Sequence, residues 1–142
     1  MFIKPLINLE NFIMPSKGDP YAAGWDIYMP EAGEVSGQSK LIDLGFATEI
    51  PQGWCALLMP RSGSGAKYGL ELNNTIGLID SSYRGEWRAA MRTKSGIPFT
   101  WAKGDKVLQF ILIPHYVAGV QMVENLSSSE RGDGGFGSTG KN

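Results

Sequence analysis

Glycine and proline recur throughout the chain and divide it into short segments. The 142 residues contain 19 glycines and 8 prolines, and no stretch of ten or more residues shows a convincing helical pattern of apolar side chains. Turn residues between short apolar runs are typical of strands joined by tight turns. We therefore expect an all-β fold, a sandwich, jelly roll or barrel, with at most a short helical turn at residues 60–69.

The strands are predicted from the apolar runs between these turns. A turn at residues 51–53 has proline in its preferred place, and Gly45 is expected to kink the run at residues 39–50. Residues 70–80 and 83–93 are predicted to pair as a hairpin. In full, the predicted strands are residues 2–9, 22–28, 39–50, 54–59, 70–80, 83–93, 99–101, 106–114 and 117–123.

Charge and cysteine content exclude several classes of protein. The formal net charge is −1 and the pI is about 5.8, so no broadly positive surface for nucleic acid or an anionic membrane is expected. The single cysteine, Cys55, permits no internal disulfide and lies in an apolar run, where we expect it to be buried. No signal peptide or membrane span is visible, which predicts a soluble, intracellular protein.

Residues 125–142 form the one compositional break. This segment is rich in serine and glycine and cannot bury enough surface to order itself, so we expect a β domain at residues 1–124 and a flexible tail. Its glycine amides and hydroxyls suit phosphates, Arg131 can pair with a phosphate, and Phe136 offers a flat face to a base. A tail without function is the alternative. The pattern GFGSTGK also fits a Walker loop, but Asn142 stands where Ser or Thr belongs and no flanking strand and helix are expected.

Four further positions are candidates for chemistry. Asp80 ends an apolar strand three residues before Tyr83, which suits activation of a water or simply a turn that Asp80 caps. Residues 60–69 (PRSGSGAKYG) suit a phosphate cradle or a solvated loop. Asp26 interrupts an apolar strand, where a metal-bound water or a salt bridge would compensate it. Gln109 lies in another apolar strand and requires a hydrogen-bonding partner.

These segments occur in an informative order. The chain contains AGWDIY, PRSGSGAKYGL, NNTIGLIDSSYRGEW, KGDKVLQFILIP and RGDGGFGSTG, in that sequence. The series resembles the five motifs of the homotrimeric deoxyuridine triphosphatase (dUTP diphosphatase, dUTPase) family, at similar spacing. The resemblance extends over residues 22–140, and its third and fifth motifs are the most specific.

The resemblance implies a jelly-roll-like β-sandwich or barrel that forms a homotrimer with active sites shared between subunits. It implies hydrolysis of dUTP to dUMP and pyrophosphate with Mg²⁺, which keeps uracil out of DNA and supplies dUMP for dTMP synthesis. It also fits a cytoplasmic enzyme of a bacterial cell or a phage-infected host. Residues 125–142 correspond to the flap that closes over the substrate.

The resemblance also implies roles for individual residues. Asp80 matches the aspartate that activates the attacking water at the α-phosphorus, Asp26 the acid that holds Mg²⁺ through water, and Tyr83 the ring that excludes a 2′-hydroxyl. Further matches are to the contacts with uracil (Asn74, Leu78, Ile79), with phosphates (Arg61, Ser62, Gly63, Gln109) and with the flap (Arg131, Phe136, Gly137, Ser138, Thr139). Arg88 is an additional substrate-binding candidate whose role stays open.

Some positions depart from the family pattern. Trp25 replaces a common tyrosine, Ser82 replaces an acid, and Lys106 and Leu108 change the fourth motif, which bears on subunit contacts and affinity more than on the reaction. Two alternative functions are compatible with the sequence. One is a deoxycytidine triphosphate deaminase of the same fold, although the glutamate that its chemistry needs cannot be placed in the sequence. The other is a nucleotide-binding regulatory module without enzymatic activity.

Overall fold

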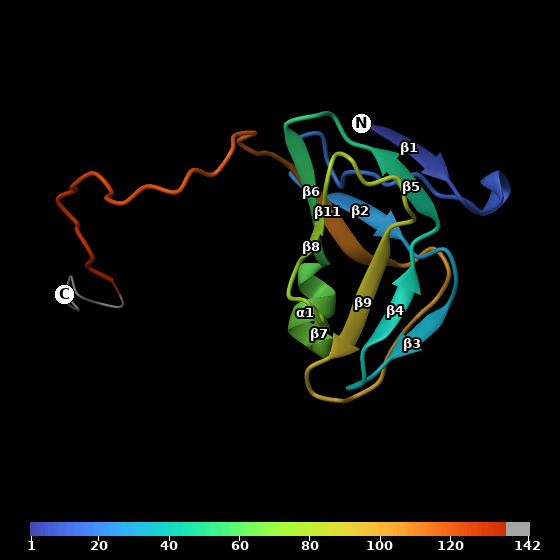
Figure 1. Ribbon diagram of the computed structural model, residues 1–142. Helices are drawn as coiled ribbons and strands as arrows, with labels where there is room; N and C mark the ends of the chain where they lie inside the picture. The colour runs from blue at the N-terminus through green and yellow to red at the C-terminus, as the bar shows by residue number, and fades with distance from the viewer. Residues whose placement is uncertain (136–142) are drawn as a thin grey trace.

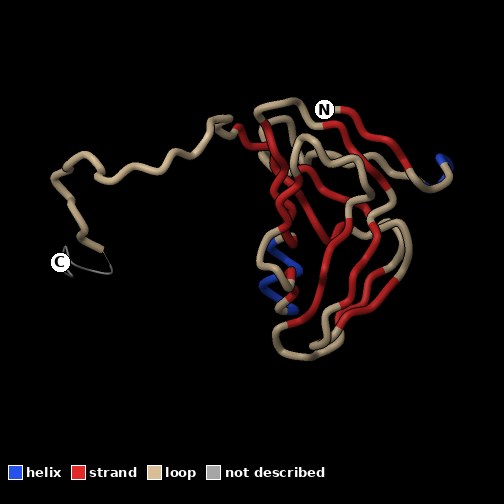
Figure 2. Tube along the Cα trace, viewed as in Figure 1, coloured by secondary structure: helices blue, strands red, loops and turns tan. Residues whose placement is uncertain are grey.

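The computed structural model describes residues 1–135, and strands make up most of its regular structure (Figures 1 and 2). One short α-helix, α1 (Ser62–Tyr68), and one 3₁₀ turn, η1 (Leu9–Asn11), accompany them. The strands are β1 (Phe2–Pro5), β2 (Trp25–Tyr28), β3 (Gly33–Val35), β4 (Lys40–Asp43), β5 (Phe46–Glu49), β6 (Trp54–Pro60), β7 (Leu70–Leu72), β8 (Gly77–Ile79), β9 (Arg88–Thr93), β10 (Phe99–Trp101) and β11 (Lys106–Pro114). The prediction of an all-β sandwich with one short helical segment is confirmed.

The strands pair in an antiparallel manner within two larger and two smaller sheets. One larger sheet has the order β2-β11-β6-β8, and the other has the order β4-β9-β7. The two-stranded sheets are β1-β5 and β10-β3. Alternation along β9 sends Ala89 and Met91 into the core and Arg88 and Arg92 away from it, as a half-buried strand requires.

The core forms where the two larger sheets face each other. Trp87, just before β9, is fully buried, and its ring lies 5.1 Å from that of Phe110 on β11 and 5.2 Å from that of Phe46 on β5. The indole nitrogen of Trp87 donates a 2.9 Å hydrogen bond to the hydroxyl of Thr48, which satisfies two buried polar groups at once. The predicted burial of Cys55 is also confirmed.

Turn chemistry explains most of the strand boundaries. Gly45, with φ of 77°, separates β4 from β5, and Gly53, with φ of 80°, precedes β6, so the predicted kink and turn are both present. A further strand, β3, occupies residues 33–35, where the sequence analysis predicted none.

The predicted pairing of residues 70–80 with residues 83–93 is confirmed for β7, which pairs with β9 in an antiparallel manner, but it is wrong for β8. Strand β8 pairs with β6, while β9 pairs with β4 and β7, so the loop after Asp80 crosses from one sheet to the other. The apolar and alternating patterns of these strands were interpreted correctly, but their pairing partners depend on residues more than 15 positions away. Sequence periodicity alone does not report such pairings.

The predicted strand at residues 117–123 is also absent, because residues 115–135 leave the body as an extended arm (Figure 1). Val120 and Met122 are fully exposed, and Tyr116 and Leu126 nearly so. The β-type sequence of this arm has no strand to pair with in its own chain over the described residues. A β-strand needs such a partner for its backbone hydrogen bonds.

Candidate active site

Strand β8 delivers Asp80 to one end of the four-stranded sheet. Ile79 pairs with Ala56 on β6, so Asp80 leaves the sheet near the beginning of β6. Asp80 is exposed and lines a hollow of about 280 Å³. The other lining residues are Leu41, Leu78, Ile79, Tyr83, Glu86 and Arg88, so the structure brings together five of the predicted site residues.

The loop between β8 and β9 is braced by its own side chains. The hydroxyl of Tyr83 donates a 3.0 Å hydrogen bond to the carbonyl of Glu86, and the ring passes directly over Gly85. A Cβ added at Gly85 would meet atoms of Tyr83 at 2.4–2.9 Å, so only glycine permits this placement of the ring. Glu86 in turn accepts a 2.9 Å hydrogen bond from the amide of Gly45, which ties the loop to the turn between β4 and β5.

Asn74 lies apart from this hollow. It occupies the turn between β7 and β8, where its side-chain amide donates a 2.9 Å hydrogen bond to the carbonyl of Ile76. The next residue, Thr75, has φ of 71°, a left-handed conformation that the turn imposes on a non-glycine residue. Asn74 therefore supports the entry into β8, and the structure does not bring its side chain to Asp80.

Asp26 is the centre of a second cluster, at the other end of β6. It is a buried carboxylate, and each of its oxygens meets a different cation. Oδ1 lies 2.8 Å from Nε of Arg61, and Oδ2 lies 3.3 Å from Nζ of Lys106. The salt bridge that the sequence left open as an explanation for Asp26 is therefore present.

The remaining members of this cluster come from β11 and from the start of α1. Gln109 pairs with Asp26 across the strands, and its amide donates a 3.4 Å hydrogen bond to the carbonyl of Pro60. Arg61 precedes α1, and with Ser62 and Gly63 it lines a shallow hollow of about 360 Å³. The first amides of a helix have no partner within it, so this hollow offers donors beside a guanidinium.

Sequence reasoning missed three members of the Asp26 cluster. Lys106 contacts Asp26 and lies 5.2 Å from the centre of the Tyr28 ring, and the hydroxyl of Tyr28 lies 2.8 Å from Oγ of Ser16. The hydrogen bond to Ser16 lowers the pKa of Tyr28, while those to Tyr28 and then Asp26 raise the pKa of Lys106. The signal was available in part, since Asp26 and Tyr28 are two positions apart on one strand and share a face.

The two groups of predicted residues are separated within one chain. Asp80 lies opposite the region of Cys55, and Arg61 comes six residues further along, which at ~3.3 Å per residue is about 20 Å. The two hollows share no lining residue. Thus one chain does not assemble all of its predicted site residues in one place.

The tail residues contribute little to the described structure. Arg131 is exposed, and its Nε donates a 2.9 Å hydrogen bond to the carbonyl of Gly134 within a local turn. The other predicted tail residues, Phe136, Gly137, Ser138 and Thr139, lie outside the described residues.

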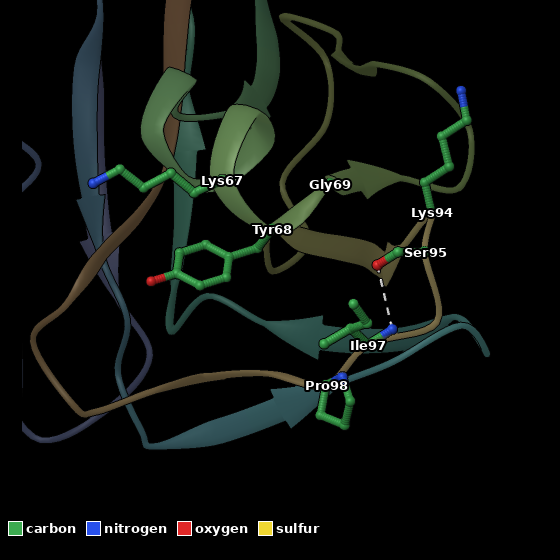
Figure 3. A pocket seen from close by; sticks show the side chains of 7 residues that line it. All are labelled: Lys67, Tyr68, Gly69, Lys94, Ser95, Ile97 and Pro98. Carbon is green, nitrogen blue, oxygen red and sulfur yellow. Dashed lines mark hydrogen bonds between the residues drawn. The ribbon is translucent and has the colours of Figure 1, made fainter.

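Another hollow, of about 370 Å³, lies beside the end of α1 (Figure 3). The ring of Tyr68 and the side chains of Ile97 and Pro98 face it, and Oγ of Ser95 accepts a 3.3 Å hydrogen bond from the amide of Ile97. The amino groups of Lys67 and Lys94 point away from it. None of the residues to which the family resemblance gives a role lines this hollow, and we assign it no role.

Metal-binding groups are sparse in the described part of the chain. Residues 1–135 hold no group of three or more His, Cys, Asp or Glu side chains arranged to bind a metal ion. Both oxygens of Asp26 already meet cations, so this carboxylate fits a contact through water better than direct ligation. None of the described helices is long and apolar enough to span a membrane.

Comparison with known proteins gives a consistent family. The model of the dUTPase family matches residues 10–140. The deoxyuridine 5′-triphosphate nucleotidohydrolase of Pseudomonas paraeruginosa is 40% identical over 134 residues, which cover 92% of this chain and 89% of that protein. The enzyme of the same name from Maricaulis maris is 38% identical over 143 residues, covering 97% and 94%.

Solved structures agree in fold. A dUTPase of Staphylococcus bacteriophage 80alpha, solved with dUpNHpp, superimposes with a TM-score of 0.86 at 26% identity, over 99% of this chain and 98% of that one. A dUTPase from a Staphylococcus aureus phage, whose structure concerns a structural Mg(II) ion, is 24% identical with a TM-score of 0.76 and supports the fold. The jelly-roll-like sandwich is thus shared with dUTPases.

Proposed function

Since this chain belongs to the dUTPase family, we propose that it hydrolyses dUTP to dUMP and pyrophosphate. The observation that carries the proposal is the division of chemistry between the two ends of β6. One end presents an exposed carboxylate, Asp80, beside the ring of Tyr83. The other end presents the cation Arg61 beside the first residues of α1. A nucleoside triphosphate needs both kinds of group, one set for its reacting end and one for its charge.

We assign the general base to Asp80. Its carboxylate accepts a proton from a water as that water attacks the α-phosphorus in line with the departing pyrophosphate. The P–O bond to the β-phosphate breaks, and the bond to the water oxygen forms. Because a phosphoryl transfer requires position and charge neutralisation more than covalent help, one carboxylate and several cations suffice.

We assign substrate selection to the strand and loop around Asp80. Backbone groups at Leu78 and Ile79 hydrogen-bond uracil, and cytosine would leave such groups unpaired, at a cost of about 1–3 kcal/mol each. The ring of Tyr83 lies under the deoxyribose and leaves no room for a 2′-hydroxyl. Arg88 lines the same hollow and is available to the substrate, while Asn74 supports the turn that leads into this region.

We propose that the cluster at the start of α1 binds the phosphates of the substrate. Arg61 supplies a guanidinium, Ser62 and Gly63 supply donors, and Gln109 supplies an amide. Mg²⁺ bound to the triphosphate oxygens would neutralise phosphate charge, with Asp26 held to it through water.

We propose that the complete site is shared between subunits of a homotrimer. Asp80 and Arg61 are about 20 Å apart along β6, further than a triphosphate can bridge with both ends engaged. A second chain that brings its Arg61 end to the Asp80 end of the first would close this gap. The exposed apolar side chains of residues 116–126 then gain a surface on a neighbouring subunit.

We further propose that residues 1–124 act as the catalytic domain and residues 125–142 as the flap. In this scheme Phe136 stacks on uracil, Arg131 meets the terminal phosphate, and Gly137, Ser138 and Thr139 contribute amides and hydroxyls. A flap that orders only on the full triphosphate would exclude water at the moment of reaction. The product dUMP would supply dTMP synthesis, and removal of dUTP would keep uracil out of DNA.

The direct test is release of pyrophosphate from dUTP, dTTP, dCTP and UTP, each with Mg²⁺. We expect rapid release from dUTP and a rate at least about 100-fold lower from the other three. Ammonia release from dCTP would instead indicate a deaminase of the same fold. Tight binding of dUTP without any product would indicate a regulatory module.

A further inference from the structure

Lys106 reaches Asp26 because of an irregularity in strand β11. Along a regular strand, residues two apart share a face, so Lys106 would point inward with Leu108. The pairing of β11 with β2 shifts register between these two residues, and both Val107 and Leu108 are buried. The bulge therefore turns Lys106 to the outer face, opposite Tyr28 and beside Asp26.

Each carboxylate oxygen of Asp26 forms an ion pair with a different side chain. Arg61 approaches Oδ1 through Nε, and its Nη1 donates a 3.4 Å hydrogen bond to the backbone carbonyl of Lys106. Lys106 occupies Oδ2, and its ammonium also lies over the Tyr28 ring. With one nitrogen held by Asp26 and another by a carbonyl, the guanidinium has a fixed orientation, and its side chain is still 41% exposed.

Resting on the proposed function, we propose that Lys106 is a positioning residue for the polyphosphate, which acts through Asp26 on Arg61. Because Lys106 pairs with Oδ2, Arg61 pairs with Oδ1 alone. The other guanidinium nitrogens of Arg61 then face the phosphates. It also offsets the negative charge of Asp26, which would otherwise repel the incoming triphosphate. The hydrogen bond between Tyr28 and Ser16 in turn fixes the ring beneath Lys106.

The test is a double-variant cycle read by binding. Affinities for dUpNHpp and inorganic triphosphate are measured by calorimetry for Lys106→Met, Asp26→Asn and the pair together. Lys106→Arg tests rescue by a conserved charge, and Lys103→Met serves as a matched control. Lys103 is also a partly exposed lysine in ion-pair range of an acid, Glu31, but it is outside the cluster. Deoxyuridine, which has no phosphate, reports the base site alone.

We expect Lys106→Met to weaken binding of both phosphate probes by roughly tenfold, with deoxyuridine binding unchanged. Lys106→Arg should restore most of the affinity, and Lys103→Met should have no effect. In the Asp26→Asn background, Lys106→Met should cost less than about threefold, because the residue through which it acts is gone.

Two results would overturn the proposal. One is unchanged affinity in a folded Lys106→Met variant. The other is the same tenfold loss in both backgrounds, which would mean that Lys106 contacts phosphate directly. If Asp26→Asn does not fold, Arg61→Gln replaces it as the second background, with the same expectation. If the proposed function is wrong, the unaltered protein will not hydrolyse dUTP. Binding of inorganic triphosphate would still test the role of Lys106 in that case.

Discussion

Asp80 and Arg61 lie at opposite ends of strand β6, because Ile79 pairs with Ala56 and Arg61 follows the last residue of the strand. In the proposed mechanism, the group that activates water and the group that binds phosphate therefore come from different subunits.

Replacing Asp80 by asparagine should remove the general base while the side chain keeps nearly the same size and shape. We expect Asp80→Asn to lower the rate of dUTP hydrolysis by about 10²- to 10⁴-fold, the usual contribution of a general base. Binding of dUpNHpp should change little. Pyrophosphate release and calorimetry measure the two quantities, and Ser82→Ala, in the same exposed turn, is the matched control. Hydrolysis at the unaltered rate would show that another group is the base.

Replacing Gly85 by alanine should displace the ring of Tyr83. The added Cβ would lie 2.4 Å from the hydroxyl and 2.6 Å from Cζ, so the ring must move. We expect kcat/KM for dUTP to fall by about tenfold and discrimination against UTP to weaken, since the ring no longer closes the space at the 2′ position. Gly18→Ala, at a position with open space around it, should change neither value. Unaltered discrimination in the Gly85 variant would remove Tyr83 from sugar selection.

Removing the tail should lower the rate of dUTP hydrolysis without changing the oligomeric state. A chain that ends at Glu130 should keep the oligomeric size of the full chain in gel filtration. Its kcat for dUTP should fall by at least about tenfold, since it lacks the groups proposed to exclude water. A truncated protein with full activity would be inconsistent with a flap.

The hydrogen bond between Trp87 and Thr48 should contribute to stability through its buried donor. Thr48→Val leaves the indole N–H of Trp87 without a partner, and we expect a loss of about 1–3 kcal/mol in the free energy of unfolding. Trp87→Phe in the same chain removes the orphaned donor, so the double variant should lose less than the sum of the single ones. Urea unfolding at one fixed protein concentration measures both. Strictly additive losses would show that the two groups are not coupled.

The Asp26 cluster should give phosphate binding a specific dependence on pH. Hydrogen bonds to Tyr28 and then Asp26 raise the pKa of Lys106, so its contribution is complete below the ordinary value of 10.5 and is lost as pH rises through the raised pKa. Tyr28 has the opposite sign, because its pKa is lowered and its deprotonated form gains from folding as pH rises.

Affinity for dUpNHpp should accordingly show no Lys106-dependent change from about pH 7 to pH 9 and should decline only above the ordinary lysine value of 10.5. Calorimetry on the unaltered protein and on Lys106→Met gives the comparison. A decline centred near pH 8 that the variant abolishes would contradict the assigned environment of Lys106.

The features that the sequence predicts correctly are those that depend on neighbouring residues. The turns at Gly45 and Gly53 and the alternation along β9 depend on neighbouring residues, so the sequence predicts them well. The partner of β8 and the fate of residues 117–123 depend on contacts that are distant in sequence or outside the chain, and both predictions were wrong. Lys106 was missed for a similar reason, because a bulge reverses the face that strict alternation would give it.

The same reasoning applies to the candidate site. Motif order identified the family, and the structure places Asp80, Tyr83 and Arg88 around one hollow, with Arg61, Ser62 and Gly63 around another. That the two hollows lie at opposite ends of β6 follows from strand register, which no motif encodes.

Mixing two inactive chains tests the shared site most directly. Asp80→Asn and Arg61→Gln chains are each expected to be nearly inactive as pure oligomers. If they are unfolded together, refolded as an equal mixture and assayed with dUTP, sites that draw Asp80 and Arg61 from different subunits should recover about one quarter of the unaltered activity, since one random pairing in four is intact. Activity no higher than that of the separate variants, in mixed oligomers of verified composition, would show that each site is built within one chain.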